Sequence, residues 1–426
     1  MKKRLITSAL PYINGVKHLG NLVGSMLPAD IYARYSRQNN HTVLYICGTD
    51  EHGAPAEIAA HNEGVSVEEY CDKYHKIQKD IYQRFNLSFD YFGRTSSSSH
   101  HKFTKEVFES IISNGYIYQD EIEQYYSIDD QRYLPDRYIE GSCPECGFKS
   151  ARGDQCDGCG CLLNPSELIE PYSALSGSKN LELRKTSHLF LDLKKLEGSL
   201  SQWLDKKTEW PELVRGISRK WLKEGLQSRC ITRDLDWGIK VPLNDDTLKA
   251  LYVWFDAPLG YISFTQEWAA LQNSGDDWKS WWKEPGNVEL VQFMAKDNVP
   301  FHTIFWPAMM MASTKNENEN EWTLANYIKG VNWLTYEGGK FSTSQKIGVF
   351  TDKALELYPA DYWRFALFSM MPEKSDSSFS FELFALAINK DLADSVGNFV
   401  SRLCKMIEKN FTEATIPAGF EVDQCL

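Results

Sequence analysis

A histidine, a glycine and an asparagine stand together in His18-Leu19-Gly20-Asn21, directly before an amphipathic stretch. The spacing places this segment between a first apolar strand and the first helix, where backbone N–H groups and the positive helix end favour a phosphate. Gly20 permits close approach of a nucleotide, and His18 can donate to a phosphate oxygen. The segment matches neither the dinucleotide fingerprint nor a P-loop, and alone it also fits an ordinary loop histidine.

A second segment, Lys340-Phe341-Ser342-Thr343-Ser344, follows two glycines. A loop rich in glycine, serine and lysine can close over a triphosphate and stabilise the charge that develops during transfer. Alone, it also fits a solvated surface loop.

Cysteines cluster in one region, since five of the ten lie between residues 143 and 161. Cys143 and Cys146 form one C-x2-C pair, and Cys156 and Cys159 form another after nine intervening residues. Four thiolates from two such turns close a tetrahedral, structural zinc site, and Cys161 is a fifth thiol that can compete with Cys159. The others are expected to be thiols without a role, namely Cys47, Cys71, Cys230, Cys404 and Cys425.

Regular elements must position these segments. The apolar patterns predict strands over Lys3–Ala9 and Thr42–Cys47 around a helix over Leu19–Ser36, which Pro28 kinks or begins, and together they form a right-handed parallel βαβ unit. Further helices are expected over Val67–Phe85 and Lys102–Asn114, and the α/β alternation resumes at Leu251–Phe255 and Val288–Met294. Ser380 is the predicted N-cap of a long amphipathic helix from Phe381 to Ile407.

Composition limits the class of protein. The chain has 426 residues, of which 42% are hydrophobic and 24% charged, so it can form a substantial core and is not a disordered chain. The net charge of −12 disfavours a protein that coats nucleic acid nonspecifically. No apolar stretch reaches the length of about 18 residues that a membrane span needs. We expect an intracellular, cytoplasmic protein with no membrane partner.

The two loops together resemble the HIGH and KMSKS signatures of class I aminoacyl-tRNA synthetases. Other segments are similar to the methionyl-tRNA synthetase family, namely Ala9–Gly20, Cys47–Gly53 (CGTDEHG), Tyr252–Pro258 (YVWFDAP) with Tyr261, and Lys296-Asp297 with Phe301-His302 and Trp306-Pro307. The resemblance covers about residues 3–410. It implies an α/β fold whose Rossmann-type parallel-sheet catalytic core is split by a zinc-knuckle connective domain and followed by a C-terminal α-helical segment.

The resemblance also implies a division of the chain. We expect residues 1–115 and 234–330 to form the two halves of the Rossmann catalytic domain, and 116–233 to be the connective insertion with its zinc knuckle at 143–161. Residues 331–375 would hold the KMSKS-like loop and a stem-contact region, and 376–426 the start of an incomplete helical anticodon-binding domain.

The implied activity is that of a methionine-tRNA ligase. Methionine would attack the α-phosphate of ATP to give methionyl-adenylate and pyrophosphate, and the methionyl group would pass to the 3'-terminal adenosine of tRNA(Met). The expected cofactors are ATP, Mg²⁺ and one structural Zn²⁺, and we expect a monomer. His18, Asn21 and Lys340 would be catalytic, and the ATP site would comprise His18, Gly20, Asn21, Asp297, Lys340 and Thr343. The methionine site would comprise Leu10, Tyr12, Asp50, Trp254, Ala257, Pro258, Tyr261, His302, Trp306 and Arg233.

Thr343 departs from the family pattern, which has a lysine there. One charged hydrogen bond contributes about 1.5–3 kcal/mol, so its loss predicts activation that is about ten- to a hundredfold slower. We expect Lys346 or Lys340 to compensate in part. Asn21, where the family commonly has a histidine, still offers a donor.

Two alternatives stay open. One is a non-catalytic or weakly active paralogue that binds nucleotide or RNA, which Thr343 supports. The other is a synthetase for leucine, isoleucine, valine or cysteine. The aliphatic enzymes need a large editing insertion, and the insertion expected here is too small for that role.

Overall fold

The computed structural model describes residues 2–153, 156, 158–159, 161, 163–243, 250–275, 277–314, 321–341 and 347–411. Within these residues, none of the helices has both the length and the apolar content that crossing a membrane requires.

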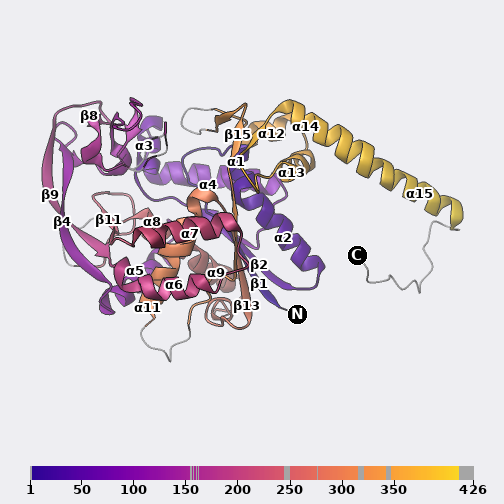
Figure 1. The fold of residues 1–426 in the computed structure, drawn as a ribbon, viewed down its shortest axis with the longest axis horizontal. Coiled ribbons are helices and arrows are strands. Elements are labelled where there is room, and N and C mark those ends of the chain that lie inside the picture. Colours follow the sequence, from indigo (N-terminus) through magenta and orange to yellow (C-terminus); the bar gives the residue numbers. More distant parts are fainter. Residues whose placement is uncertain are drawn as a thin grey trace.

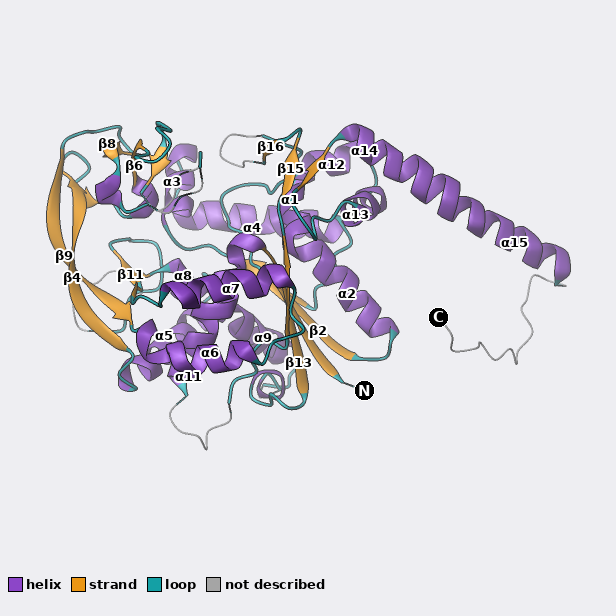
Figure 2. Ribbon diagram, viewed as in Figure 1, coloured by secondary structure: helices purple, strands orange, loops and turns teal. Residues whose placement is uncertain are grey.

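A five-stranded sheet forms the centre of the larger lobe (Figure 2). Its spatial order is β14 (Tyr327–Val331), β13 (Val288–Ala295), β1 (Lys3–Ser8), β2 (Thr42–Thr49) and β3 (Tyr91–Arg94). Every neighbouring pair is parallel, and the central β1 aligns Lys3 with Val288 on one side and Thr42 on the other. The chain runs outward from β1 to β3 and then returns to the opposite side of β1. The order therefore reverses between β1 and β13, and open α/β sheets bind ligands at the carboxyl ends of the strands at such a point.

The helix after β1 is continuous but changes its winding. It consists of α1 (Leu19–Asn21), a π-helical turn η1 (Leu22–Met26) and α2 (Leu27–Gln38). Pro28 lies in the first turn of α2, directly after the π-helical turn, so it marks the change of winding and not the start of the helix. The strands and helix expected between residues 3 and 47 are confirmed.

Side-chain caps fix the starts of two further helices. Ser66 and Glu69 form a reciprocal capping box at α4 (Val67–Arg84), as the expected start at Val67 requires. Ser97 caps α5 (Ser98–Ser113), which therefore begins four residues before the predicted Lys102. A short helix, α3 (Ala54–Glu63), connects β2 to α4.

Two glycines allow helix α9 (Gly260–Leu271) to lie directly on the sheet. A Cβ atom at Gly48 of β2 or at Gly93 of β3 would come within 2.4 Å of the Phe264 ring. This close approach positions α9, and with it Tyr261, near the carboxyl ends of the strands. The short helix α8 (Val253–Asp256) precedes α9, so of the predicted 251–255 segment only Leu251 lies in a strand, β12 (Ala250–Leu251). A short apolar run does not distinguish a buried strand from a buried helix.

A long antiparallel ribbon projects from the sheet lobe (Figure 1). β4 (Ile117–Ser127) pairs with β9 (Leu181–Leu191), flanked by β5 (Arg132–Tyr133) and β10 (Arg229–Cys230). A small sheet of β7 (Ala151–Arg152), β6 (Ile139–Ser142) and β8 (Ile169–Ser173) lies at its far end. The chain returns through α6 (Glu197–Asp205) and α7 (Glu212–Glu224), and Val214 of α7 joins a core cluster with Met294 and Ile328 of the central sheet.

The C-terminal part begins with a second small sheet of β16 (Gly339–Lys340), β15 (Leu334–Tyr336) and β17 (Ser377–Phe379). α12 (Thr351–Leu357), α13 (Ala360–Ser369) and α11 (Trp306–Ser313) complete the lobe. α14 (Phe381–Leu386), the π-helical η8 (Ala387–Gly397) and α15 (Asn398–Asn410) then form one long rod that extends away from it (Figure 1). The Ser380 hydroxyl accepts a hydrogen bond from the Leu383 N–H, so the predicted N-cap is confirmed.

Candidate active site

A cavity of about 400 Å³ opens at the carboxyl edge of the central sheet. Residues that follow β1, β2, β13 and β14 all contribute to its wall, as the strand order requires. The structure brings together twelve of the predicted site residues there: Leu10, Tyr12, His18, Gly20, Asn21, Asp50, Trp254, Ala257, Pro258, Tyr261, Asp297 and His302.

His18 is held in one orientation by the start of the helix that follows it. The ring nitrogen Nδ1 accepts a hydrogen bond from the backbone N–H of Asn21 at 3.3 Å. The backbone N–H of His18 donates to Asn21 Oδ1, also at 3.3 Å. The ring also stacks on Phe341, with centroids 4.8 Å apart. Burial, assisted by the charge of Lys17, lowers the pKa of His18 to about 3. The imidazole is therefore neutral at pH 7, and because Nδ1 accepts, Nε2 carries the proton and can donate to a ligand.

Asp50 directly follows β2 and is 6% exposed. Burial raises the pKa of its carboxyl well above the usual value, and the nearby Asp256 and Glu51 act in the same direction. Oδ1 of Asp50 has no hydrogen-bond partner among the described residues. A buried carboxyl oxygen without a partner, on a residue that lines a cavity, suits a ligand that brings a positive charge.

Lys17 is buried beside this carboxylate, with only 3% of its surface exposed. Its Nζ donates to Asn14 Oδ1 at 2.5 Å. Burial lowers the pKa of Lys17 to about 7, although Asp50 opposes the change.

An aromatic wall faces the carboxylate side of the cavity. Trp254 lies edge-on to Phe301, with ring centroids 4.9 Å apart. His302 Nε2 lies 2.8 Å from the Tyr261 hydroxyl, and its Nδ1 lies 2.9 Å from the Asn298 carbonyl oxygen. Burial lowers the pKa of His302 to about 4, so the neutral ring donates from Nδ1 and accepts from Tyr261 at Nε2. The wall is thus largely apolar, and the Tyr261 hydroxyl and both His302 ring nitrogens are already paired.

Two π-helical turns border the cavity, and neither was predicted from the sequence. η1 contributes Met26, and η7 (Phe301–Phe305) contributes Phe301 and His302. Such turns change the hydrogen-bond pattern without changing the apolar pattern, so hydropathy does not reveal them. Other lining residues that were not predicted include Asn298 and Phe341, which are next to the predicted Asp297 and Lys340.

Two predicted residues lie outside the cavity wall. Trp306 is fully buried, with its ring centroid 5.9 Å from that of Trp282. The Arg233 guanidinium lies 3.7 Å from the centroid of the Tyr252 ring and donates to the Thr232 carbonyl at 2.9 Å. Neither residue contributes to the lining.

The KMSKS-like loop is only partly described. Lys340 lies in β16, opposite Thr335. Thr343 and Lys346, like the rest of 342–346, lie outside the described residues, as do residues 315–320.

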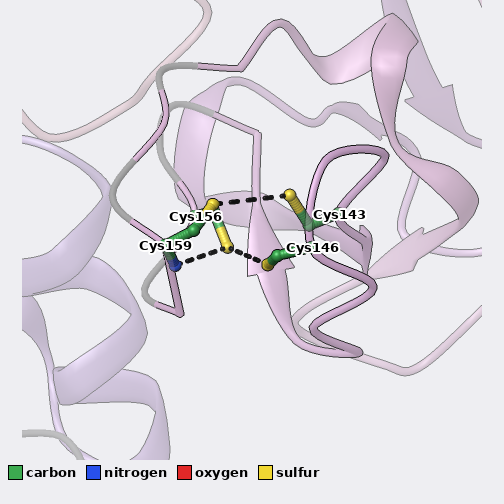
Figure 3. A group of neighbouring side chains, drawn as sticks. All are labelled: Cys143, Cys146, Cys156 and Cys159. Atoms are coloured by element: carbon green, nitrogen blue, oxygen red, sulfur yellow. Dashed lines mark hydrogen bonds between the residues drawn. The ribbon is translucent and has the colours of Figure 1, made fainter.

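The four predicted metal ligands meet at the tip of the ribbon. Figure 3 shows Cys143 and Cys146 on one turn facing Cys156 and Cys159 on the other. Their four Sγ atoms lie within 4.8 Å of one another, with 3.9 Å between Cys143 and Cys159 and 3.6 Å between Cys146 and Cys156. Tetrahedral zinc with Zn–S bonds of about 2.3 Å places its sulfurs about 3.8 Å apart, so the arrangement fits that ion.

Cys161 lies beside the same cluster. Its Sγ is 3.7 Å from that of Cys143 and 3.3 Å from that of Cys159. Because 3.3 Å is shorter than the spacing of two ligands of one tetrahedron, Cys159 and Cys161 are alternatives for one corner of a site.

Comparisons with known proteins agree with this geometry. A family model described as tRNA synthetases class I (M) matches residues 4–404. Methionine--tRNA ligase 1 of Acaryochloris marina is 55% identical over 415 residues, which are 97% of this chain and 73% of that protein. Methionine--tRNA ligase of Streptomyces avermitilis is 53% identical over 431 residues, covering 98% of this chain and 74% of that protein.

A solved structure is similar in fold. Methionyl-tRNA synthetase of Mycobacterium tuberculosis, bound by methionyl-adenylate, superposes with a TM-score of 0.72 at 23% identity, covering 99% of this chain and 75% of that one. The parallel sheet, the cavity at its switch point and the matched residues together show that the chain belongs to the class I tRNA synthetases of the M family.

Proposed function

We propose that the chain is a methionine-tRNA ligase. It activates methionine with ATP to give methionyl-adenylate and pyrophosphate, and then transfers the methionyl group to the 3'-terminal adenosine of tRNA(Met). The observation that carries this proposal is a single cavity that combines an oriented phosphate donor, His18, with a buried acceptor for an ammonium, Asp50. The names of the relatives with at least 53% identity support the choice of amino acid.

Methionine binds with its ammonium at Asp50 and its side chain against the aromatic wall. A thioether packs well on aromatic rings, and Trp254 and Tyr261 offer them here. Leu10, Ala257 and Pro258 complete the apolar surface, and Tyr12 borders it while its hydroxyl donates to the His52 carbonyl at 2.7 Å. Trp306 belongs to the same core cluster as Trp254, and Arg233 packs on Tyr252, whose ring lies next to that of Trp254.

ATP binds across the other half of the cavity. The His18 Nε2–H would donate to its phosphates, while Gly20 keeps the backbone accessible. Asn21 Oδ1 is occupied by the His18 N–H, so its amide group remains to donate. Asp297 is exposed at the mouth, where its Oδ1 accepts from Trp333 Nε1 at 3.3 Å and it can also accept from a ribose hydroxyl.

The activation step needs positioning and charge stabilisation. The methionine carboxylate attacks the α-phosphorus in line, the bond to the bridging oxygen breaks, and pyrophosphate leaves. Lys340, with Lys346 in place of the lysine that Thr343 replaces, would stabilise the leaving group. Mg²⁺ would neutralise the phosphates when it arrives with ATP.

The cysteine cluster would hold one structural Zn²⁺. Four thiolates leave no open position on the ion, so its role would be to join the two turns at the tip of the ribbon. We further propose a monomer that acts in the cytoplasm, a compartment that keeps such thiols reduced.

Exchange of labelled pyrophosphate into ATP tests this proposal. We expect exchange with methionine and none with leucine or cysteine. Asp50→Asn should weaken exchange at low methionine, whereas Asp80→Asn, a change of the same type on the exposed face of α4, should not. A folded, zinc-loaded chain without methionine-dependent exchange would instead favour the non-catalytic paralogue.

A further inference from the structure

A second cavity, of about 410 Å³, lies at the base of the ribbon, between the C-terminal end of α7 and the start of β10. It shares no lining residue with the candidate active site. α7 contributes Ile217, Lys220, Trp221 and Glu224 to its wall, and the chain that follows contributes Gln227 and Arg229. A cavity of this size is large enough for a small-molecule ligand.

The guanidinium of Arg229 is half-buried in this wall and has no anionic partner among the described residues. Its Nε is buried without a hydrogen bond. Its Cζ lies 5.0 Å from the centroid of the Trp221 ring and 6.0 Å from that of Phe305. Burial lowers the pKa of Arg229, and no charge of a described residue acts on it in either direction.

Other half-buried arginines of the chain are paired with carboxylates. Arg94 lies 2.7 Å from Glu51, and Arg4 lies 2.9 Å from Glu289. Removing a cation from water without an anion costs free energy, and contacts with aromatic rings recover only part of it. An anionic ligand in the cavity would supply the partner that Arg229 lacks.

The remaining polar groups of the wall also favour an anion that accepts several hydrogen bonds. Within the described residues, neither the Trp221 indole N–H nor the Gln227 amide has a hydrogen-bond partner. Lys220 lies 3.8 Å from Glu224, and an ammonium in such an exposed pair can still donate to a second acceptor. Two cations and one carboxylate leave the wall with a net positive charge. A phosphate has more acceptor oxygens than a carboxylate and therefore matches these donors better.

We propose that this cavity binds an adenosine phosphate, with the phosphate at Arg229 and the base against the apolar surface of Ile217 and Trp221. The ligand is either a free nucleotide or the 3'-terminal nucleotide of an RNA. The phosphate is inferred from the unpaired donors. The choice of adenosine rests on the proposed function, because that reaction releases AMP and uses the 3'-terminal adenosine of tRNA.

Phe305 connects this cavity to the candidate active site. Its ring lies edge-on to Trp221, with centroids 5.7 Å apart, and its centroid is 5.8 Å from that of Trp254. Trp254 lines the active-site cavity, whereas Trp221 lines the second one. A nucleotide at Arg229 would therefore lie close to the proposed methionine site, but separated from it by a packed aromatic ring.

Equilibrium dialysis of labelled AMP against the zinc-loaded chain tests the proposal. A non-hydrolysable sulfamoyl analogue of methionyl-adenylate fills the active site first, so that AMP is not bound there. We expect one equivalent of AMP per chain with a Kd of about 0.1–1 mM, as a few charge-assisted hydrogen bonds provide. No saturable binding of AMP or of RNA up to about 10 mM would overturn the proposal.

A matched pair of variants separates binding from a structural role. Arg229→Met removes the guanidinium but keeps an apolar side chain beside Trp221, and the loss of a charge-assisted hydrogen bond should weaken AMP binding about ten- to a hundredfold. Arg219→Met, the same change at an exposed position of α7, should bind AMP as the wild-type chain does. Because Arg229 has no anionic partner in the free chain, Arg229→Met should melt no lower than Arg219→Met by circular dichroism. A lower melting temperature with unchanged AMP binding would assign Arg229 a structural role and overturn the proposal.

Three ligands identify the source of the phosphate. Adenosine, which has no phosphate, should not bind, and binding as tight as that of AMP would contradict the assignment. Tighter binding of the single-stranded RNA 5'-CCA-3' than of AMP would assign the site to the end of a tRNA, and the reverse order would assign it to a free nucleotide. If the adenylate analogue itself does not bind, the proposed function fails, whereas phosphate binding that depends on Arg229 would still support this site.

Discussion

Lys17 provides a quantitative test of the electrostatics around the cavity. It is 3% exposed, its Nζ donates to Asn14 Oδ1, and Asp50 is the charge that opposes the effect of burial. Burial therefore penalises the protonated form, and the pKa falls from 10.5 to about 7. The unfolded chain keeps the ordinary value, so between pH 7 and pH 10.5 it binds more protons at this site than the folded chain does.

The size of the effect follows from the shift. Each pKa unit corresponds to about 1.4 kcal/mol, so the buried charge costs about 5 kcal/mol below pH 7 and about 4 kcal/mol at pH 7. Lys17→Met removes this cost and loses the hydrogen bond to Asn14, which contributes about 1 kcal/mol. We expect the substitution to raise the free energy of unfolding by about 3 kcal/mol at pH 7.

The lowered pKa of Lys17 also fixes the direction in which the stability difference changes with pH. The wild-type chain should gain about 1.4 kcal/mol per pH unit from Lys17 between pH 7 and pH 10.5, so the advantage of Lys17→Met should disappear by pH 10.5. Urea unfolding of both proteins, followed by tryptophan fluorescence at pH 7, 8, 9 and 10, measures the difference. Lys79→Met, at an exposed lysine of α4, should change little at any pH. Destabilisation at pH 7, or a difference that does not vary with pH, would refute the reasoning.

Three further predictions concern the site and the metal cluster. Asp50→Asn removes a charge-assisted hydrogen bond to the substrate ammonium and should raise the KM for methionine about ten- to a hundredfold, with a smaller effect on the KM for ATP, as steady-state exchange kinetics will show. Thr343→Lys should speed adenylate formation by up to about a hundredfold in single-turnover assays; no gain would mean that Lys346 already fills the role. Cys146→Ser should lose bound zinc and lower the melting temperature, whereas Cys161→Ser should retain one zinc per chain by elemental mass spectrometry, and equal loss in both variants would contradict the assignment.

The sequence predicted the elements that are specified by apolar periodicity and by turn-forming residues at their ends. β1, β2 and the helix between them follow from apolar runs separated by prolines and glycines, and Ser380 marked the start of the C-terminal rod. The edge strands β3 and β14 were not predicted, because they are only four and five residues long. Their pairing depends on partners that are distant in the chain, which local propensity does not report.

The site was predictable where residue spacing implies chemistry. The two C-x2-C pairs specified a sulfur cluster, and the matched motifs placed twelve of the predicted residues around one cavity. Trp306 lies in the core instead, because an aromatic residue next to a motif suits a core as well as a pocket.

Direct identification of the adenylate tests the central claim. The chain is mixed with ATP, Mg²⁺ and all twenty amino acids at equal concentration, and the enzyme-bound products are identified by mass spectrometry after an acid quench. The account predicts methionyl-adenylate as the dominant product, and its absence from the Asp50→Asn variant at low methionine. An adenylate of another amino acid, or none from a folded and zinc-loaded chain, would contradict it.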